Sequence, residues 1–253
     1  MGKRGMLIAD DTGMGKTAQQ LGIAADAFYS GRTKRILIVT TKDQVATVNF
    51  PRDNKMLGLD LPITWMHKDN KEYTKQHGYN WKDYHFNGKP TKKGGKPPAE
   101  YKPFQVGDGV IIMSKDTFRD AKESVIKWLE GAEGDVTIII DESHEFANGE
   151  AGRGKANKLI YNHFKDKAQW IYASATAAEN IDALEHMYGL QKWSTDGFGT
   201  FKLRLTSADV KATAGKKQTG MSASFAKNGN SPFQREIPLT MMEQITRELK
   251  LDG

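Results

Sequence analysis

The sequence predicts an α/β fold with a mostly parallel central sheet and helices on both of its faces, and three observations carry this prediction. Short and nearly continuous apolar runs recur along the chain. A stretch with helical periodicity follows each run. The chain has 253 residues, which is long enough to bury both faces of a sheet. Strands that are apolar on both sides and separated by helices are typical of parallel sheets.

Five apolar runs are expected to form the strands. They are residues 6–9, 36–39, 110–113, 136–140 and 170–173. A helix is expected over residues 16–29, whose apolar positions share one face. Another helix is expected after the third run, where Phe118, Val125 and Leu129 recur at helical spacing. The alternation of strand and helix is that of a sheet built from crossover units.

Two stretches interrupt this alternation. Residues 66–103 are rich in Lys, Asn, Gly and Pro and hold nine lysines against four acidic residues. This composition predicts a basic insertion or a long loop. Residues 207–253 are expected to form a polar connector and a terminal helix, because Thr240 and Glu243 match a capping box.

The composition excludes some classes of protein. The formal net charge of +6 and the sequence pI near 9.2 favour a polyanionic partner. There is no cysteine, which excludes a disulfide framework. No apolar run approaches the roughly 18 residues needed to span a bilayer. We therefore expect a soluble protein of the cell interior, located in the cytoplasm, the nucleoid or the nucleus.

The strongest motif is Asp-Asp-Thr-Gly-Met-Gly-Lys-Thr at residues 10–17, between the first expected strand and helix. Glycines let successive backbone N–H groups face a polyphosphate, while Lys16 can reach the β and γ oxygens and Thr17 can bind Mg²⁺. A strict phosphate-binding loop has glycine where this chain has Asp10. The alternative is an ordinary glycine turn. The candidate nucleotide-binding residues are Thr12, Gly13, Met14, Gly15, Lys16 and Thr17.

The second motif is Asp-Glu-Ser-His at residues 141–144, at the end of an apolar run. Carboxylates at the C-terminal ends of parallel strands lie where such sheets bind ligands. Asp141 is expected to hold Mg²⁺ together with Thr17, and Glu142 to orient or deprotonate the attacking water. We take Lys16, Asp141 and Glu142 as the catalytic candidates. The alternative is a solvated strand end.

The third motif is Ser-Ala-Thr at residues 174–176, directly after the next apolar run. Its hydroxyl groups are suited to relay a change at the γ-phosphate by hydrogen bonds toward the acidic motif. The candidate coupling residues are His144, Ser174 and Thr176. The alternative is a polar turn after a strand.

The order of these motifs resembles motifs I, II and III in the first RecA-like domain of superfamily 2 helicases and translocases. Asp10 in place of a glycine is similar to the Swi/Snf-type branch. Residues 172–176, Gly220-Met221 and Ile237-Pro238-Leu239 are similar to the strawberry-notch-like helicases of eukaryotes and phages.

The resemblance implies a RecA-like P-loop NTPase domain over residues 1–253, with motifs at 10–17, 141–144 and 174–176. It implies ATP and Mg²⁺ as cofactors and hydrolysis of ATP to ADP and phosphate. In this family a second RecA-like lobe completes the site, and this chain lacks it, with residues 207–253 leading toward it. The chain alone is therefore expected to bind MgATP and to hydrolyse it slowly, unless the second lobe is supplied in cis or in trans.

The resemblance also implies nucleic-acid contacts, with DNA favoured over RNA. In the family the loops after two of the strands touch the nucleic-acid backbone, and these loops here hold Thr41, Lys42, Ser114 and Lys115. Lys92 and Lys93 of the basic stretch are further candidates. The alternative for each loop is an ordinary helix cap.

Two other functions remain open from the sequence. One is a nucleic-acid-binding or scaffold module in which the basic stretch matters more than a weak or vestigial nucleotide site. The other is a P-loop enzyme of a different reaction class, such as a small-molecule kinase.

Overall fold

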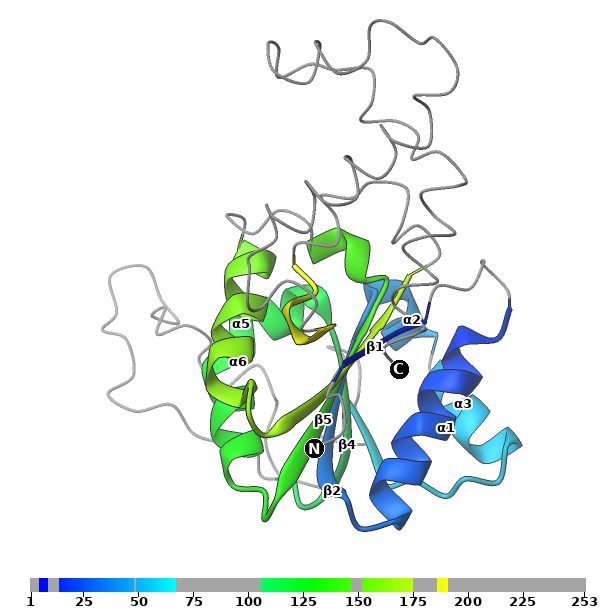
Figure 1. Ribbon diagram of the computed structural model, residues 1–253. Helices are drawn as coiled ribbons and strands as arrows, with labels where there is room; N and C mark the ends of the chain where they lie inside the picture. The colour runs from blue at the N-terminus through cyan, green and yellow to red at the C-terminus, as the bar shows by residue number, and fades with distance from the viewer. Residues whose placement is uncertain are drawn as a thin grey trace, which may run out of the picture.

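The computed structural model describes residues 5–8, 14–47, 49–66, 106–146, 152–174 and 186–190 (Figure 1). A six-stranded sheet with the strand order β1-β6-β5-β2-β4-β3 forms its centre. Every pair of neighbouring strands is parallel. The predicted α/β class with a parallel sheet is therefore confirmed.

The strands agree with the five predicted runs and add one that was not predicted. They are β1 (Gly5–Ile8), β2 (Thr33–Thr40), β3 (Ile63–Met66), β4 (Gly109–Ser114), β5 (Asp135–Asp141) and β6 (Ala168–Ala173). The additional strand is β3, which lies at the edge of the sheet. Only Met66 of its four residues is fully buried, so an edge strand of this kind needs no continuous aliphatic run.

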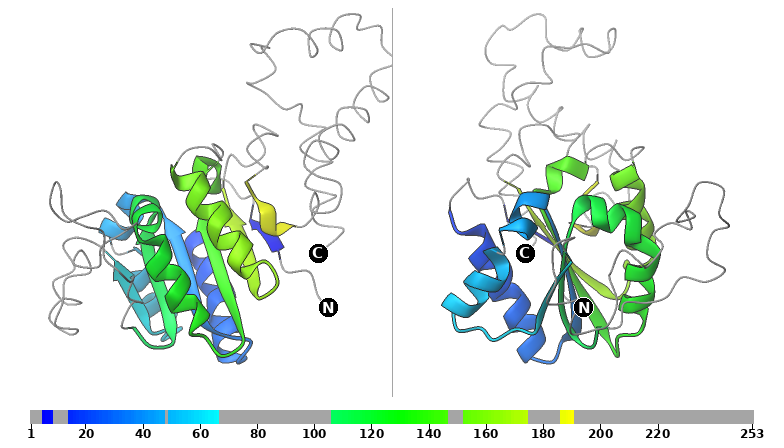
Figure 2. Two further views of the ribbon diagram at one scale, coloured as in Figure 1. Left: turned by 90° about the vertical axis from the view of Figure 1, so that its left-hand side faces the viewer. Right: turned by 180° about the vertical axis from the view of Figure 1, so that it is seen from behind.

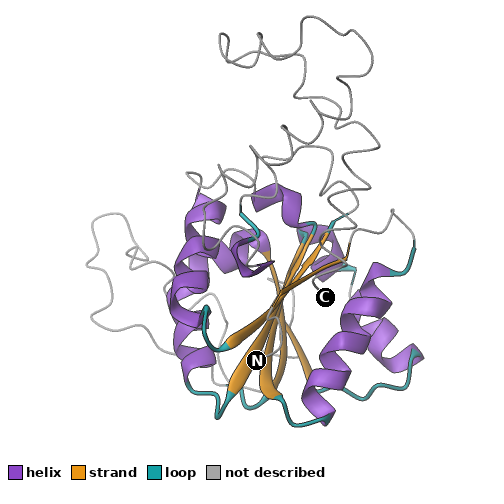
Figure 3. Ribbon diagram, viewed as in Figure 1, coloured by secondary structure: helices purple, strands orange, loops and turns teal. Residues whose placement is uncertain are grey.

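The helices lie in two layers, one on each face of the sheet (Figures 1 and 3). They are α1 (Lys16–Tyr29), α2 (Lys42–Ala46), α3 (Asn49–Met56), α5 (Lys115–Glu130) and α6 (Gly152–Phe164), with 3-10 helices η3 (Ser143–Phe146) and η5 (Tyr188–Leu190). The predicted bounds of the first helix, 16–29, are confirmed. The view from behind in Figure 2 shows the same two layers with the sheet between them.

Alternate residues of the central strands pack against opposite layers. In β2, Ile38 packs in a cluster that includes Leu21 of α1, while Leu37 packs in a cluster that includes Trp128 of α5. All four side chains are buried. Each buried aliphatic side chain contributes about 1.5–3 kcal/mol relative to exposure, so packing against the two layers holds the central strands in place.

The C-terminal ends of the parallel strands meet at one edge of the sheet. Asp141 of β5 is in register with Ala173 of β6, and Thr40 of β2 is in register with Ser114 of β4. Parallel pairing of β2 and β5 brings Thr40 beside Asp141 although 101 positions separate them in sequence. This edge therefore gathers polar residues that end or directly follow β2, β4, β5 and β6.

Some sequence predictions fall outside the described residues. They concern the basic stretch 66–103 apart from Met66, and the connector and terminal helix of 207–253. In the described parts of the chain, no helix has the length and apolar character required to cross a bilayer.

Candidate functional site

The first element of the site is the start of α1. Gly15 precedes the helix with φ of 78°, in the left-handed region that favours glycine. In the described part of the chain no side chain caps this helix end, and its first turn holds no acidic residue. Lys16 and Thr17 open the helix half-buried. Backbone N–H groups at such an end carry partial positive charge and favour an anion.

The remaining residues of the phosphate loop are only partly described. Met14 is exposed. Thr12 and Gly13 lie outside the described residues. The described part of the loop is thus its junction with α1, where the conformation of Gly15 turns the chain into the helix.

The second element is Asp141 at the end of β5, which is only 6% exposed. Its Oδ1 accepts a hydrogen bond of 2.8 Å from Nε2 of Gln20, and its Oδ2 accepts one of 2.7 Å from Oγ1 of Thr40. Gln20 lies one turn after Lys16, on the same side of α1. The bond from Gln20 therefore joins the phosphate-loop helix directly to the acidic end of β5.

Gln20 and Thr40 are residues that the sequence analysis did not assign to the nucleotide site. The spacing of Gln20, four positions after Lys16, is visible in the sequence. The pairing of β2 with β5, which brings Thr40 to Asp141, becomes visible only in the folded chain.

The third element is Glu142, which follows Asp141 in a turn. Its φ of 44° is in the left-handed region, which is unfavourable for a residue with a side chain. Its carbonyl oxygen accepts hydrogen bonds from Nζ of Lys115 at 2.9 Å and from the backbone N–H of Glu145 at 3.2 Å. The turn places the half-buried carboxylate of Glu142 at the sheet edge beside Asp141.

His144 connects the acidic motif to the strand on its other side. Its Nδ1 lies 2.9 Å from Oγ of Ser174 and 3.4 Å from Oε2 of Glu142. The backbone N–H of Ser174 donates to the carbonyl of Ile8 at the end of β1. The structure thus brings Glu142, His144 and Ser174 together, while Thr176 lies outside the described residues.

The two loops that the resemblance assigned to nucleic acid both cap helices. Oγ1 of Thr41 accepts a hydrogen bond from the N–H of Gln44 at the start of α2. Oγ of Ser114 accepts one from the N–H of Thr117 at the start of α5. Lys42 is exposed beside the first cap. Helix capping, the alternative considered for these loops, is therefore what both hydroxyl groups do in this structure.

Lys115 is not placed as a nucleic-acid contact. Its side chain is 2% exposed, and its Nζ forms an ion pair with Oε1 of Glu145 at 3.2 Å. Burial lowers the pKa of Lys115, and the neighbouring carboxylates oppose this shift. This placement contradicts the interpretation of Lys115 as a phosphate contact, because a buried and paired ammonium group cannot reach a nucleic-acid backbone. Lys92 and Lys93 lie outside the described residues.

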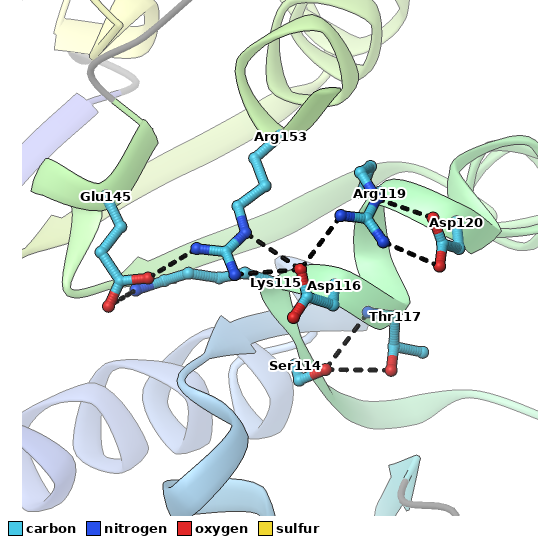
Figure 4. Close-up of polar contacts among 8 residues, drawn as sticks. All are labelled: Ser114, Lys115, Asp116, Thr117, Arg119, Asp120, Glu145 and Arg153. Atoms are coloured by element: carbon cyan, nitrogen blue, oxygen red, sulfur yellow. Dashed lines mark hydrogen bonds and ion pairs between the residues drawn. The ribbon is translucent and has the colours of Figure 1, made fainter. Parts of the chain in front are cut away.

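A charged network surrounds Lys115 (Figure 4). Arg153 of α6 donates to Oδ1 of Asp116 at 2.9 and 3.1 Å and to Oε2 of Glu145 at 2.9 Å. Arg119 donates to the same oxygen of Asp116 at 3.2 Å. The network joins α5, η3 and α6. The sequence gives no sign that these charged residues link three elements, because their alternating charges resemble those of a solvated helix face.

The donor set is compatible with a magnesium ion bound to a nucleotide. Carboxylate oxygens have more acceptor sites than Asp141 uses for Gln20 and Thr40, so both can still accept bonds from metal-bound waters. Gln20 Oε1 is buried without a hydrogen-bond partner in the described residues. No cluster of three or more His, Cys, Asp or Glu side chains suited to a metal occurs in that part of the chain. Mg²⁺ is commonly held by one or two protein groups plus phosphate and water oxygens.

The hydrogen bond from Thr40 to Asp141 is expected to be worth more than an ordinary one, because its acceptor is charged. We expect Thr40→Val to lower the free energy of unfolding by about 1.5–3 kcal/mol. Thr33→Val is the matched control, since Thr33 is buried in the same strand but donates to the neutral carbonyl of Asp135. It is expected to cost about 0.5–1.5 kcal/mol. Urea unfolding measures the free energy of unfolding of both variants. An equal loss in the two would contradict the stronger hydrogen bond assigned to Thr40 and Asp141.

The comparison with protein families gives one match over most of the chain. The family model described as P-loop containing NTP hydrolase pore-1 matches residues 2–224. No curated protein sequence matches this chain.

Three solved structures illustrate the structural likeness. The Sulfolobus solfataricus SWI2/SNF2 ATPase core in complex with dsDNA has 19% identity and a TM-score of 0.46, covering 72% of this chain and 30% of its own. The core domain from the same organism has 18% identity and a TM-score of 0.46, covering 88% and 37%. A nuclease-deletion mutant of the Type ISP restriction-modification enzyme LlaGI with a DNA substrate mimic has 20% identity and a TM-score of 0.41, covering 69% and 13%. This chain thus spans between 13% and 37% of those chains.

Proposed function

This chain belongs to the P-loop containing NTP hydrolase pore-1 family, and from this premise we propose that it is the ATP-binding lobe of a nucleic-acid-dependent ATPase of the helicase or translocase type. It binds MgATP and hydrolyses it to ADP and phosphate when a second RecA-like lobe completes the site. The observation that supports this most directly is the buried 2.8 Å bond from Gln20 to Asp141. It joins the start of the phosphate-loop helix to the acidic end of β5. A phosphoryl-transfer site requires both parts, one for the phosphates and one for the metal ion.

Each part of the site has a role in this proposal. The N-terminus of α1 and the backbone around Gly15 bind the phosphates, and Lys16 contacts the β and γ oxygens. Thr17 and Asp141 would hold Mg²⁺, which neutralises charge on the phosphates. The roles of Thr12, Gly13 and Met14 in this loop remain predictions.

Glu142 acts on the attacking water. Its carboxylate orients the water and takes one proton as the water oxygen bonds to the γ-phosphorus and the bond to the ADP oxygen breaks. Its position beside Asp141 at the C-terminal edge of the sheet supports this role.

His144 and Ser174 couple the nucleotide to the rest of the sheet. Glu142, His144 and Ser174 form a continuous polar chain, and Ser174 is bonded to the end of β1. A change in the charge near Glu142 therefore has a physical route to the strand that precedes the phosphate loop. Thr176 remains a predicted member of this chain.

The nucleic-acid partner, with DNA favoured, rests on charge and on the resemblance of the motifs. The net charge of +6 favours a polyanion, and Lys42 is exposed at the sheet edge. Contact with the nucleic-acid backbone remains a proposed role for Thr41 and Ser114, through the helix ends that they cap. The intracellular location and the likeness to the strawberry-notch type are proposals on the same basis.

The test is MgATP binding and hydrolysis by this chain, measured with and without single-stranded and duplex DNA. We expect calorimetric binding of MgATP, slow hydrolysis, and a higher hydrolysis rate with DNA. A slow rate is expected when these residues are measured without a second lobe, since an arginine supplied by such a lobe is worth about 10³ to 10⁵ in rate. Absence of MgATP binding at millimolar concentration would overturn the nucleotide assignment, and a rate indifferent to DNA would overturn the proposed partner.

A further inference from the structure

The most unusual side chain near the site is the buried lysine at the start of α5. Lys115 is 2% exposed, and its Nζ lies 5.9 Å from the ring centroid of Phe146. Burying an ammonium group is costly, and a buried ion pair is often no more stabilising than apolar residues of the same volume. The free energy of unfolding alone therefore gives little reason for a lysine at this position.

The contact made by Lys115 is not a consequence of strand pairing. Lys115 follows β4, whereas its acceptor Glu142 follows β5, and β2 lies between these two strands in the sheet. The lysine side chain has the length to bridge this gap and to deliver a hydrogen bond of 2.9 Å to the carbonyl oxygen of Glu142.

That carbonyl belongs to a residue in an unfavourable conformation. Glu142 has φ of 44°, which a residue with a side chain adopts only where its surroundings hold it. Among the described residues, two donors fix its carbonyl oxygen: the backbone N–H of Glu145 from within the turn, and Nζ of Lys115 from α5. The lysine thus holds the turn from another element of the fold.

The ammonium group pairs with Glu145, and a network that spans three elements holds this carboxylate in turn. Glu145 of η3 pairs with Lys115 and also with Arg153 of α6, and Arg153 pairs with Asp116 of α5 (Figure 4). A donor fixed in this way sets the position of a carbonyl oxygen more closely than a mobile surface lysine does.

We infer that Lys115 is a positioning residue for Glu142: its hydrogen bond to the Glu142 carbonyl holds the left-handed turn that presents the Glu142 carboxylate to the attacking water. The inference rests on the proposed function, because it concerns the same site. It replaces the earlier role of Lys115 as a phosphate contact with a role inside the catalytic edge of the sheet.

The test compares Lys115→Met with Lys122→Met in this chain. Methionine keeps the length and the packing of the lysine but has no donor. Lys122 is the matched control, since it lies on the same helix, is partly buried and pairs with a neighbouring glutamate, Glu123 at 3.0 Å. We expect Lys115→Met to lower kcat about 10²-fold, the size of effect that a displacement near 1 Å produces, with KM for ATP unchanged. Lys122→Met is expected to leave kcat unchanged.

Two further measurements separate positioning from a general structural role. Amide hydrogen exchange over residues 142–146 is expected to become faster in Lys115→Met and not in Lys122→Met. In a Glu142→Gln background, Lys115→Met is expected to lower kcat no further, because residues acting through one another are not additive. Unchanged kcat and unchanged exchange in folded Lys115→Met would overturn the inference.

The outcomes also distinguish this inference from the proposed function. If Glu142→Gln hydrolyses ATP like the unchanged chain, the role of Glu142 in the proposed function fails, and hydrogen exchange still decides whether Lys115 holds the turn. If Lys115→Met does not fold, Arg153→Met replaces it, because Arg153 is partly exposed and anchors Glu145. That variant is expected to lower kcat about 10-fold at constant KM, and an unchanged kcat would overturn the inference as well.

Discussion

Glu142→Gln is expected to lower the rate of ATP hydrolysis by about 10² to 10⁴-fold, the contribution typical of a general base. Glutamine has nearly the same size and can still contact a water, but its amide cannot accept the proton. MgATP binding is expected to persist, because in the proposed site the phosphates and the metal are held by α1 and Asp141 rather than by the Glu142 carboxylate. Steady-state hydrolysis and calorimetric binding by the same preparation measure the two effects.

The control for this variant is Glu133→Gln, at an exposed residue that pairs with Lys34 and precedes β5, whereas the acidic motif lies at the other end of this strand. It is expected to keep both hydrolysis and binding, because exposed ion pairs contribute little. Hydrolysis that survives in Glu142→Gln would indicate either a contaminating ATPase or a base other than Glu142. Loss of MgATP binding in the same variant would contradict the division of roles between Glu142 and Asp141.

The sequence was sufficient for the parts of the fold that depend on strong local patterns. The runs at 36–39 and 136–140 are apolar on both faces, and only a strand covered by helices on both sides can bury such a run. The edge strand β3 was missed because Ile63–Met66 is only partly buried and carries no such pattern. Local periodicity reports burial, so it is weakest where an element is half-exposed.

In the site, the sequence identifies the acidic residues but not the residues that contact them. Asp141 and Glu142 are recognisable because a strand followed by two acids is a local pattern. Gln20 is recognisable only with the contact between α1 and β5 known, since its importance comes from the oxygen that it reaches. A motif therefore identifies a charge, while the donors that orient this charge arise from the packing of distant segments.

Lys115 illustrates why a residue type cannot be assigned a role from its motif alone. The sequence places it in a short polar stretch after a strand, where a lysine is suited either to phosphate or to an internal carboxylate. The choice depends on whether η3 folds back over the start of α5, which brings Glu145 to the ammonium group. That folding depends on the turn at Glu142, which the sequence does not reveal.

Lys16→Ala is expected to weaken MgATP binding about 100-fold or more, which corresponds to about 2.7 kcal/mol. In the proposed site Lys16 supplies the one full positive charge at the start of α1, where the backbone contributes only partial charge. Removing it leaves the β and γ oxygens without the ammonium group that contacts them in the proposed site. Calorimetry gives the change in affinity directly, and the shift of the unfolding midpoint by MgATP gives it independently, because a ligand at 100 times Kd stabilises by about 2.7 kcal/mol.

Lys55→Ala is the control for Lys16→Ala, because Lys55 is an exposed lysine in the last turn of α3 and its loss changes the net charge equally. A general electrostatic attraction between a basic protein and a polyanion would make the two variants lose affinity alike, and added salt would reduce both. A phosphate loop predicts a loss confined to Lys16→Ala and only weakly dependent on salt. MgATP binding that is unchanged in Lys16→Ala would mean that the start of α1 does not hold the phosphates. The roles proposed for Thr17, Asp141 and Glu142 would then fail as well, because each assumes phosphates bound there.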